Sequence, residues 1–147
     1  MKNLVRFSAI ILVAALLFAT PVSAESATPY ANSYITSTHS TVYRVSGNSL
    51  GIRFEVFANG TMLQLGVNSI KMQVSPNGTS NWTTMKTFTP DNYSQMMTTG
   101  SAHYVNTVPY TSTYRYYYRA CIEYYARNSS GSSTVTDYSN VFYVSVV

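Results

Sequence analysis

The side chains that could carry acid-base, nucleophilic or metal chemistry are few and scattered along this chain of 147 residues. Serine is abundant, but no Gly-X-Ser-X-Gly elbow is present to expose a nucleophile. The other candidate groups also lack any recognised spacing of metal ligands. These groups are His39, Asp91, His103, Cys121, Glu123 and Asp137. The sequence therefore predicts no catalytic residue, no metal and no cofactor, and it favours a protein that is not an enzyme.

Molecular recognition is a better match to residues 114–127, in which apolar positions alternate with arginine and tyrosine. Successive side chains of a β-strand point to opposite faces, so this period of two predicts one long strand. Tyrosine and arginine are enriched at binding surfaces because each combines planar contact area with a polar tip. The side chains expected to form a ligand-binding face are Arg115, Tyr117, Arg119, Tyr125 and, from a neighbouring strand, Lys71. A solvated sheet face with cross-strand pairs is the alternative.

The remaining tyrosines of this stretch alternate in phase with Ala120 and Ile122, and we expect them in or at the edge of the core. They are Tyr114, Tyr116, Tyr118 and Tyr124. Either Tyr114 or Tyr116 is expected to anchor its hydroxyl to nearby backbone, as a tyrosine corner does. Trp82 is expected to be half buried at the core's edge, and a sugar-stacking platform is the alternative.

The N-terminal segment predicts export. Lys2 and Arg6 precede an apolar run, and Val22-Ser23-Ala24 has small residues where a signal peptidase cuts. The run is shorter than the roughly 20 apolar residues that span a bilayer, so we expect cleavage after Ala24 and no membrane association afterwards. The protein is thus predicted to be secreted and extracellular, with a signal peptide over residues 1–24, a flexible lead-in over 25–32, and one domain over 33–147.

Cleavage also changes the charge of the chain. The full sequence carries nine basic and five acidic residues, a net charge of +4. Two of the nine leave with the signal peptide, and the other seven are spread along the chain rather than clustered. Nucleic-acid-binding domains gather Lys and Arg in patches, so nucleic acid is not the predicted partner.

Cys121 is the chain's single cysteine, so it cannot form an internal disulfide. It alternates in phase with Arg119 and Glu123, which places it on the polar face of the predicted strand. Two interpretations remain open. Cys121 is either a half-buried small apolar residue, or it forms a disulfide with a second chain and so makes a homodimer.

The rest of the chain indicates the fold class. Alternating segments are separated by turn residues such as Pro76 and the Asn77-Gly78 pair, and no segment after the signal peptide has a helical period. Residues 89–100 have no period and are expected to form a long loop. The predicted strands are residues 34–45, 50–57, 70–75, 82–88, 102–108, 114–127 and 135–147. About seven short strands predict an all-β protein, an antiparallel β-sandwich of the immunoglobulin and fibronectin III-like kind, preceded by a cleaved signal-peptide helix.

Two stretches resemble known domains. The strand, turn and tryptophan-bearing return of Ile70 to Trp82, and the entry Thr113 to Tyr116, are similar to fibronectin type III and immunoglobulin-like domains. A second resemblance covers most of residues 33–127. It is carried by Asn59 to Met62, Leu65 and Gly66, Ser69 and Ile70, Asn81 to Thr83, Lys86 to Phe88, Met96 and Met97, His103 and Tyr104, Tyr117 and Tyr118, and Ala120. On these residues the chain resembles an uncharacterised family of small secreted proteins of Gram-positive bacteria, a domain of unknown function. This resemblance implies a source and an export route, and it implies no activity.

Together these observations predict a secreted, non-enzymatic binding or adhesion-type module whose partner is an extracellular protein, a glycan or a cell-envelope polymer. A self-associating structural protein, linked through Cys121 or through paired edge strands, is the alternative. A hydrolase or a toxin-like effector ranks last.

Overall fold

The computed structural model describes residues 34–145, which form nine β-strands and one short 3-10 helix. The predicted signal peptide with its cleavage point at Ala24, the lead-in over 25–32, and residues 146–147 lie outside the described part. Within residues 34–145, no helix has the length and apolar character needed to cross a membrane.

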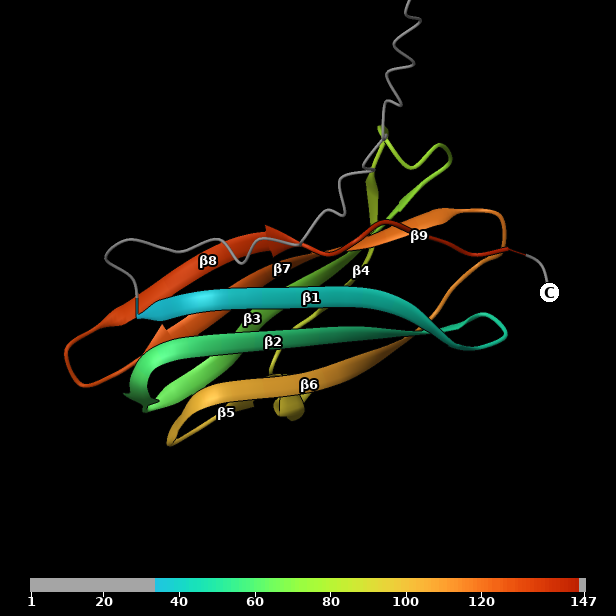
Figure 1. Ribbon diagram of the computed structural model, residues 1–147. Helices are drawn as coiled ribbons and strands as arrows, with labels where there is room; N and C mark the ends of the chain where they lie inside the picture. The colour runs from blue at the N-terminus through green and yellow to red at the C-terminus, as the bar shows by residue number, and fades with distance from the viewer. Residues whose placement is uncertain (1–33, 146–147) are drawn as a thin grey trace, which may run out of the picture.

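The first sheet has three antiparallel strands in the order β1-β2-β6 (Figure 1). They are β1 (Ile35–Ser46), β2 (Ser49–Met62) and β6 (Ser101–Thr111). β2 continues past residue 57, where the predicted strand ends, so that Asn59 and Gly60 lie inside it, and its pairing with β6 is interrupted between Phe57 and Met62.

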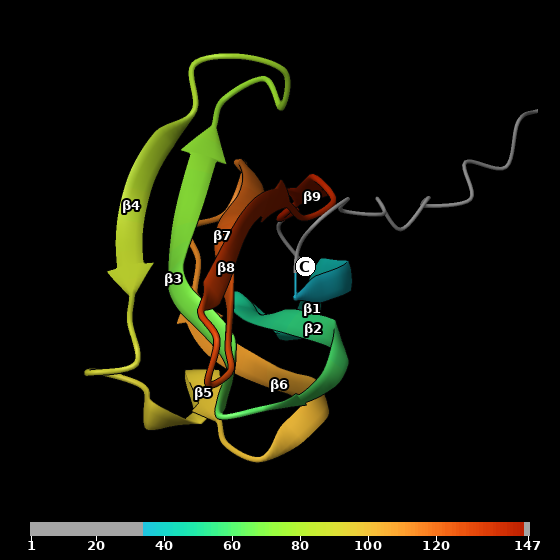
Figure 2. The same cartoon turned by 90° about the vertical axis from the view of Figure 1, so that its left-hand side faces the viewer.

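The second sheet lies behind the first and has the order β4-β3-β7-β8, also antiparallel (Figures 1 and 2). Two short strands complete it, because β5 pairs with β3 and β9 pairs with β7. The six strands are β3 (Gln64–Ser75), β4 (Thr83–Phe88), β5 (Met97–Thr98), β7 (Tyr117–Arg127), β8 (Ser132–Tyr138) and β9 (Phe142–Tyr143). Two such sheets packed face to face confirm the predicted all-β, antiparallel β-sandwich.

The core fills the space between the two sheets. Every second residue of β7 is buried, from Tyr118 to Ala126, and these side chains meet Phe54 of β2 and Phe88 of β4 in one apolar cluster. Burying a side chain of this size stabilises the fold by about 1.5–3 kcal/mol each. The alternation predicted for β7 is therefore confirmed from Tyr117 onward, with Tyr118 and Tyr124 in the core.

The start of β7 corrects the prediction. The strand begins at Tyr117 rather than Tyr114, because Tyr114 and Arg115 form a turn in which Arg115 adopts a φ of 69°. The backbone here bonds to the C-terminal segment instead of to β3, with the Arg115 amide donating to the Val144 carbonyl at 2.7 Å. Tyr114 and Tyr116, expected in the core, are exposed. Tyr116 instead lines a surface groove of about 440 Å³ with Pro76 and Met85.

The tyrosine corner is formed by Tyr118, not by Tyr114 or Tyr116. The Tyr118 hydroxyl accepts a hydrogen bond from the Thr113 amide at 2.8 Å and donates to the Thr113 carbonyl at 3.1 Å. A buried phenol needs such a partner, because an unsatisfied hydroxyl in the core is costly. These two hydrogen bonds fix the loop that connects β6 to β7. They thereby fix the position along the sheet at which the outward-facing residues of β7 begin.

The long loop over residues 89–100 contains two short elements that sequence periodicity did not predict. A 3-10 helix, η1 (Ser94–Met96), buries Met96, and β5 then pairs Met97 with Gly66 at the start of β3. Gly66 has a φ of 155°, and its Cα lies so close to the backbone of residues 96 and 97 that a Cβ would overlap the Met96 carbonyl oxygen. Close backbone approach is the structural reason for a glycine at this position.

Candidate functional site

The outer face of the second sheet brings residues of β3, β7 and β8 side by side. Gln73 of β3 is paired with Arg119 of β7, and the Arg119 Nε donates to the Gln73 Oε1 at 2.8 Å. Lys71 is paired with Cys121, which on its other side is paired with Tyr138 of β8. The pairing places Lys71 beside the outward residues of β7, as the sequence predicted.

The Arg119 guanidinium lies against two aromatic rings. Its central carbon is 4.2 Å from the centroid of the Trp82 ring and 4.4 Å from that of Tyr138. Trp82 immediately precedes β4, and Tyr138 ends β8, so the two rings come from opposite sides of β7. Each contact of a cation with an aromatic face contributes about 0.5–1 kcal/mol at an exposed site. Arg119 is thus held in one orientation. Trp82 is half buried as expected, but it lies against Arg119 on the outer face of the second sheet rather than at the edge of the core.

A pair of tyrosines whose rings pack at a tilt extends this arrangement. The ring centroids of Tyr117 and Tyr143 are 4.7 Å apart, with their planes at 45°. Tyr117 also packs on Gly78 of the β3–β4 turn, where φ is 74° and a Cβ would lie 2.8 Å from the tyrosine ring. Trp82, Tyr117, Arg119, Tyr138 and Tyr143 form a continuous surface that we call the aromatic-arginine strip.

The β3–β4 turn beside the strip is tied together by side-chain hydrogen bonds. The buried Ser75 hydroxyl accepts from the amides of Asn77 and Gly78 at 3.2 and 3.0 Å. The Asn77 Oδ1 accepts from the amides of Thr79 and Ser80 at 3.1 and 3.0 Å. Such bonds order a turn that would otherwise be mobile. Trp82 follows this turn directly, so its ring is positioned by a fixed segment of chain.

Of the predicted binding residues, three lie together and two do not. Tyr117, Arg119 and Lys71 share the outer face around the strip. Tyr125 is on the same face, but it is six positions along β7 from Arg119, a separation of about 20 Å. Arg115 does not belong to this outer face, because it lies in the turn before β7 rather than on the sheet.

Sequence reasoning missed Tyr138 and Tyr143 as members of the site. Both are exposed, and they reach Arg119 and Tyr117 only because β8 and β9 pair with β7 in one particular register. The available signal was the polar loop over residues 128–131, which marks a hairpin and so pairs the residues that follow with β7. It was insufficient, because the strand is interrupted between Tyr138 and Phe142, and the register of the pairing with β7 shifts there.

Cys121 is a free thiol on the same outer face, half buried between Lys71 and Tyr138. Its placement on the polar face agrees with the predicted phase of β7. Because β7 has a neighbour on both sides, Cys121 lies in the interior of the sheet rather than at an edge.

A separate charged cluster lies on the outer face of the first sheet. The Glu55 carboxylate contacts Arg53 at 3.1 Å and the His103 ring nitrogen at 2.9 Å, and the His103 ring stacks on Phe57 with centroids 4.2 Å apart. Partial burial acts to raise the pKa of Glu55, but the hydrogen bond to His103 and the charge of Arg53 outweigh it and lower that pKa. Within residues 34–145, no three His, Cys, Asp or Glu side chains are placed to hold a metal ion.

Comparison of the chain with models of known protein families finds no matching family, and comparison with curated proteins finds no match. The resemblance to small secreted proteins of Gram-positive bacteria stays a prediction.

Proposed function

We propose that this protein is an exported, non-enzymatic binding or adhesion-type module that uses the aromatic-arginine strip to hold an extracellular ligand, which is a cell-envelope polymer, a glycan or a protein. The observation that carries the proposal is the Arg119 guanidinium held between Trp82 and Tyr138. Export is supported by the N-terminal apolar segment after Lys2 and Arg6.

Pre-organisation is what makes this surface suited to binding. Immobilising a long side chain at an interface costs about 0.5–1.5 kcal/mol, and that cost is met on folding when the side chain is already stacked and hydrogen-bonded. Arg119 is fixed in this way by Gln73 and its two rings. The charge of Arg119 also has no acidic partner among residues 34–145, since the two ion pairs formed there are those of Glu55 with Arg53 and His103.

The rings of the strip supply the contact area. Tyr138 is 51% exposed, and Tyr143 is also exposed, so a flat partner can lie on them. Sugar rings, proline rings and peptide planes all pack on aromatic faces, and tyrosine hydroxyls hydrogen-bond to their polar groups. This combination supports a glycan, an envelope polymer or a protein as the ligand.

The proposal is tested by cosedimentation of the secreted protein with purified Gram-positive cell walls and by binding to a glycan array. We expect the Trp82→Ala, Tyr138→Ala double variant to bind at least ~10-fold more weakly, because central aromatic anchors dominate interface energies. Arg119→Lys keeps the charge but loses planar stacking and should also weaken binding.

The matched control is Tyr43→Ala on the first sheet, where Tyr43 is 38% exposed and distant from the strip in the fold. It should bind like the parent. A folded double variant that binds as tightly as the parent would show that the strip is not the binding surface, and a parent that binds neither walls nor glycans contradicts those two ligand classes.

A self-associating structural protein is the second candidate, favoured by the accessible side of Cys121 and by β4. Stacking the outer faces of two second sheets would bring two Cys121 thiols together, and five of the six residues of β4 are exposed on an edge strand. Unpaired strand edges are sites where a second chain can add.

Under this second candidate, size-exclusion chromatography and non-reducing electrophoresis should show a dimer. If the link is a disulfide, the dimer disappears with reductant and in Cys121→Ser; if it is edge pairing, the dimer persists in both. A protein that stays monomeric under oxidising conditions at all concentrations excludes this candidate.

A further inference from the structure

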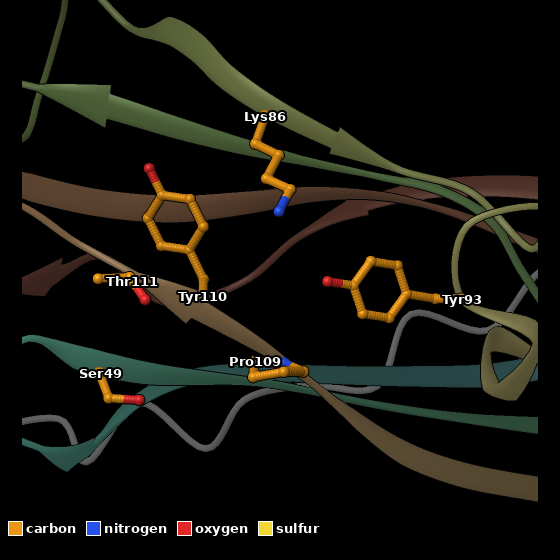
Figure 3. Close-up of a pocket in the computed structure, with 6 residues that line it drawn as sticks. All are labelled: Ser49, Lys86, Tyr93, Pro109, Tyr110 and Thr111. Atoms are coloured by element: carbon orange, nitrogen blue, oxygen red, sulfur yellow. The ribbon is translucent and has the colours of Figure 1, made fainter.

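A pocket of about 320 Å³ opens between the edge strands of the two sheets, β4 of the second and β6 of the first. None of its lining residues belongs to the aromatic-arginine strip. The residues that line it are Ser49, Lys86, Tyr93, Pro109, Tyr110 and Thr111 (Figure 3).

Lys86 provides the charge in this pocket. It is paired with the buried Met72, so it lies on the side of β4 that faces the sandwich rather than the outer side. Its ammonium is 4.8 Å from the centroid of the Phe88 ring and 6.0 Å from that of Tyr93. Aromatic faces hold a cation in place without neutralising it. No acidic side chain among residues 34–145 forms an ion pair with Lys86.

Two tyrosine rings lie on either side of the ammonium. In Figure 3 the Lys86 side chain extends into the space between the Tyr110 and Tyr93 rings, and the Tyr93 hydroxyl points into that same space. Burial, helped by the neighbouring Tyr118 phenol, raises the pKa of Tyr110. Tyr110 therefore stays uncharged across the physiological pH range, and its ring forms a neutral wall of the pocket.

We propose that this pocket binds the carboxylate of a small organic acid whose ring lies against Tyr93, Tyr110 and Pro109. One ammonium matches a singly charged carboxylate better than a doubly charged phosphate. The Tyr93 hydroxyl adds a neutral donor beside the acid group, and the two aromatic rings and the proline offer flat apolar walls to the attached ring. A sugar acid and an aromatic acid share this chemistry, and the experiment distinguishes them.

The test uses the secreted protein with ¹³C-labelled lysine and follows the Cε–Hε signals by NMR. Lys71 lies on the outer face of the second sheet, away from this pocket, so its signal serves as the internal reference. Sodium glucuronate and sodium benzoate are titrated separately, with glucose and sodium chloride as controls. We expect a saturable shift of the Lys86 signal with a Kd on the order of 1–10 mM, as befits a small ligand held by one charge.

The titrations with glucuronate, with benzoate and with the two controls have distinct outcomes. A larger affinity for glucuronate assigns the pocket to sugar acids, and a larger affinity for benzoate assigns it to aromatic acids. No response to glucose or chloride shows that the carboxylate is required. If neither acid gives a saturable shift of Lys86, or if Lys71 and Lys86 move together as a general salt effect would make them, the inference is wrong.

Variants separate charge from shape. Lys86→Met should weaken binding several-fold, since the contact between the ammonium and the carboxylate is lost, whereas Lys86→Arg should retain it. Tyr93→Phe should weaken it several-fold by removing the donor that points into the pocket, while Tyr43→Phe, which removes a hydroxyl on the outer face of the first sheet, should have no effect. A Lys86→Met protein with an unchanged amide spectrum and unchanged glucuronate and benzoate affinities overturns the assignment. Binding at the aromatic-arginine strip should be unaffected by any of these changes.

Discussion

Phe88→Ala is expected to lower the free energy of unfolding by about 3–5 kcal/mol, the usual range for removing a fully buried phenylalanine. The ring is buried where β4 meets the core, and it packs edge-on against Tyr93 and Tyr110 with centroids 5.1 and 6.5 Å away. Its loss leaves a cavity between two strands that only partly collapse. Urea denaturation followed by circular dichroism measures the change.

Phe57→Ala is the matched control for this prediction. Phe57 is 38% exposed on the outer face of the first sheet, so its truncation should cost less than about 1.5 kcal/mol. Equal losses for the two variants would mean that Phe88 does not contribute to the core as the structure indicates. Because Phe88 also underlies the Lys86 ammonium, its removal should loosen the pocket between β4 and β6.

Gly66→Ala is expected to cost about 3 kcal/mol, combining an unfavourable backbone conformation with steric overlap. At a φ of 155° the added methyl would overlap the Met96 carbonyl oxygen and lie 2.9 Å from the Met97 Cα. Both are backbone atoms, and backbone yields less readily than a flexible side chain. The strain should separate β5 from β3, which the same urea titration detects as a lower midpoint.

Gly60→Ala serves as the comparison, since a Cβ at Gly60 meets nothing within 4 Å. This change should stay within about 0.5 kcal/mol of the parent. A Gly66→Ala variant as stable as Gly60→Ala would mean that β5 is not held against β3 in solution.

The fold class was predictable because alternation along a strand is a local property of the sequence. Residues 117–127 carry small or apolar side chains at every second position, and the structure buries that set. The predicted start of this strand at Tyr114 was wrong because the prediction relied on this local alternation alone. Tyr114 and Tyr116 continue the alternation, but the pairing of residues 115 and 116 with Val144, 28 or more positions away, removes them from the sheet face. Residue types cannot report a contact made so far along the chain.

The candidate site was predictable only as far as neighbouring strands could be inferred. Lys71 and Arg119 come together because β3 and β7 pair along their whole length. Tyr138 and Tyr143 depend on the register of β8 and β9, which no residue pattern specifies. The pocket around Lys86 was not predicted at all, since it joins β4 to β6 across the gap between two sheets, and no spacing in the sequence relates them.

The tryptophan of the aromatic-arginine strip is the single tryptophan of the whole chain. With the Arg119 guanidinium 4.2 Å from the centroid of its ring, its fluorescence reports the polarity and solvent access of one known location. No second indole adds background, so a molecule that covers the strip changes the emission of the unlabelled protein directly. The same stacking that holds Arg119 in one orientation thus makes the occupancy of this face optically measurable.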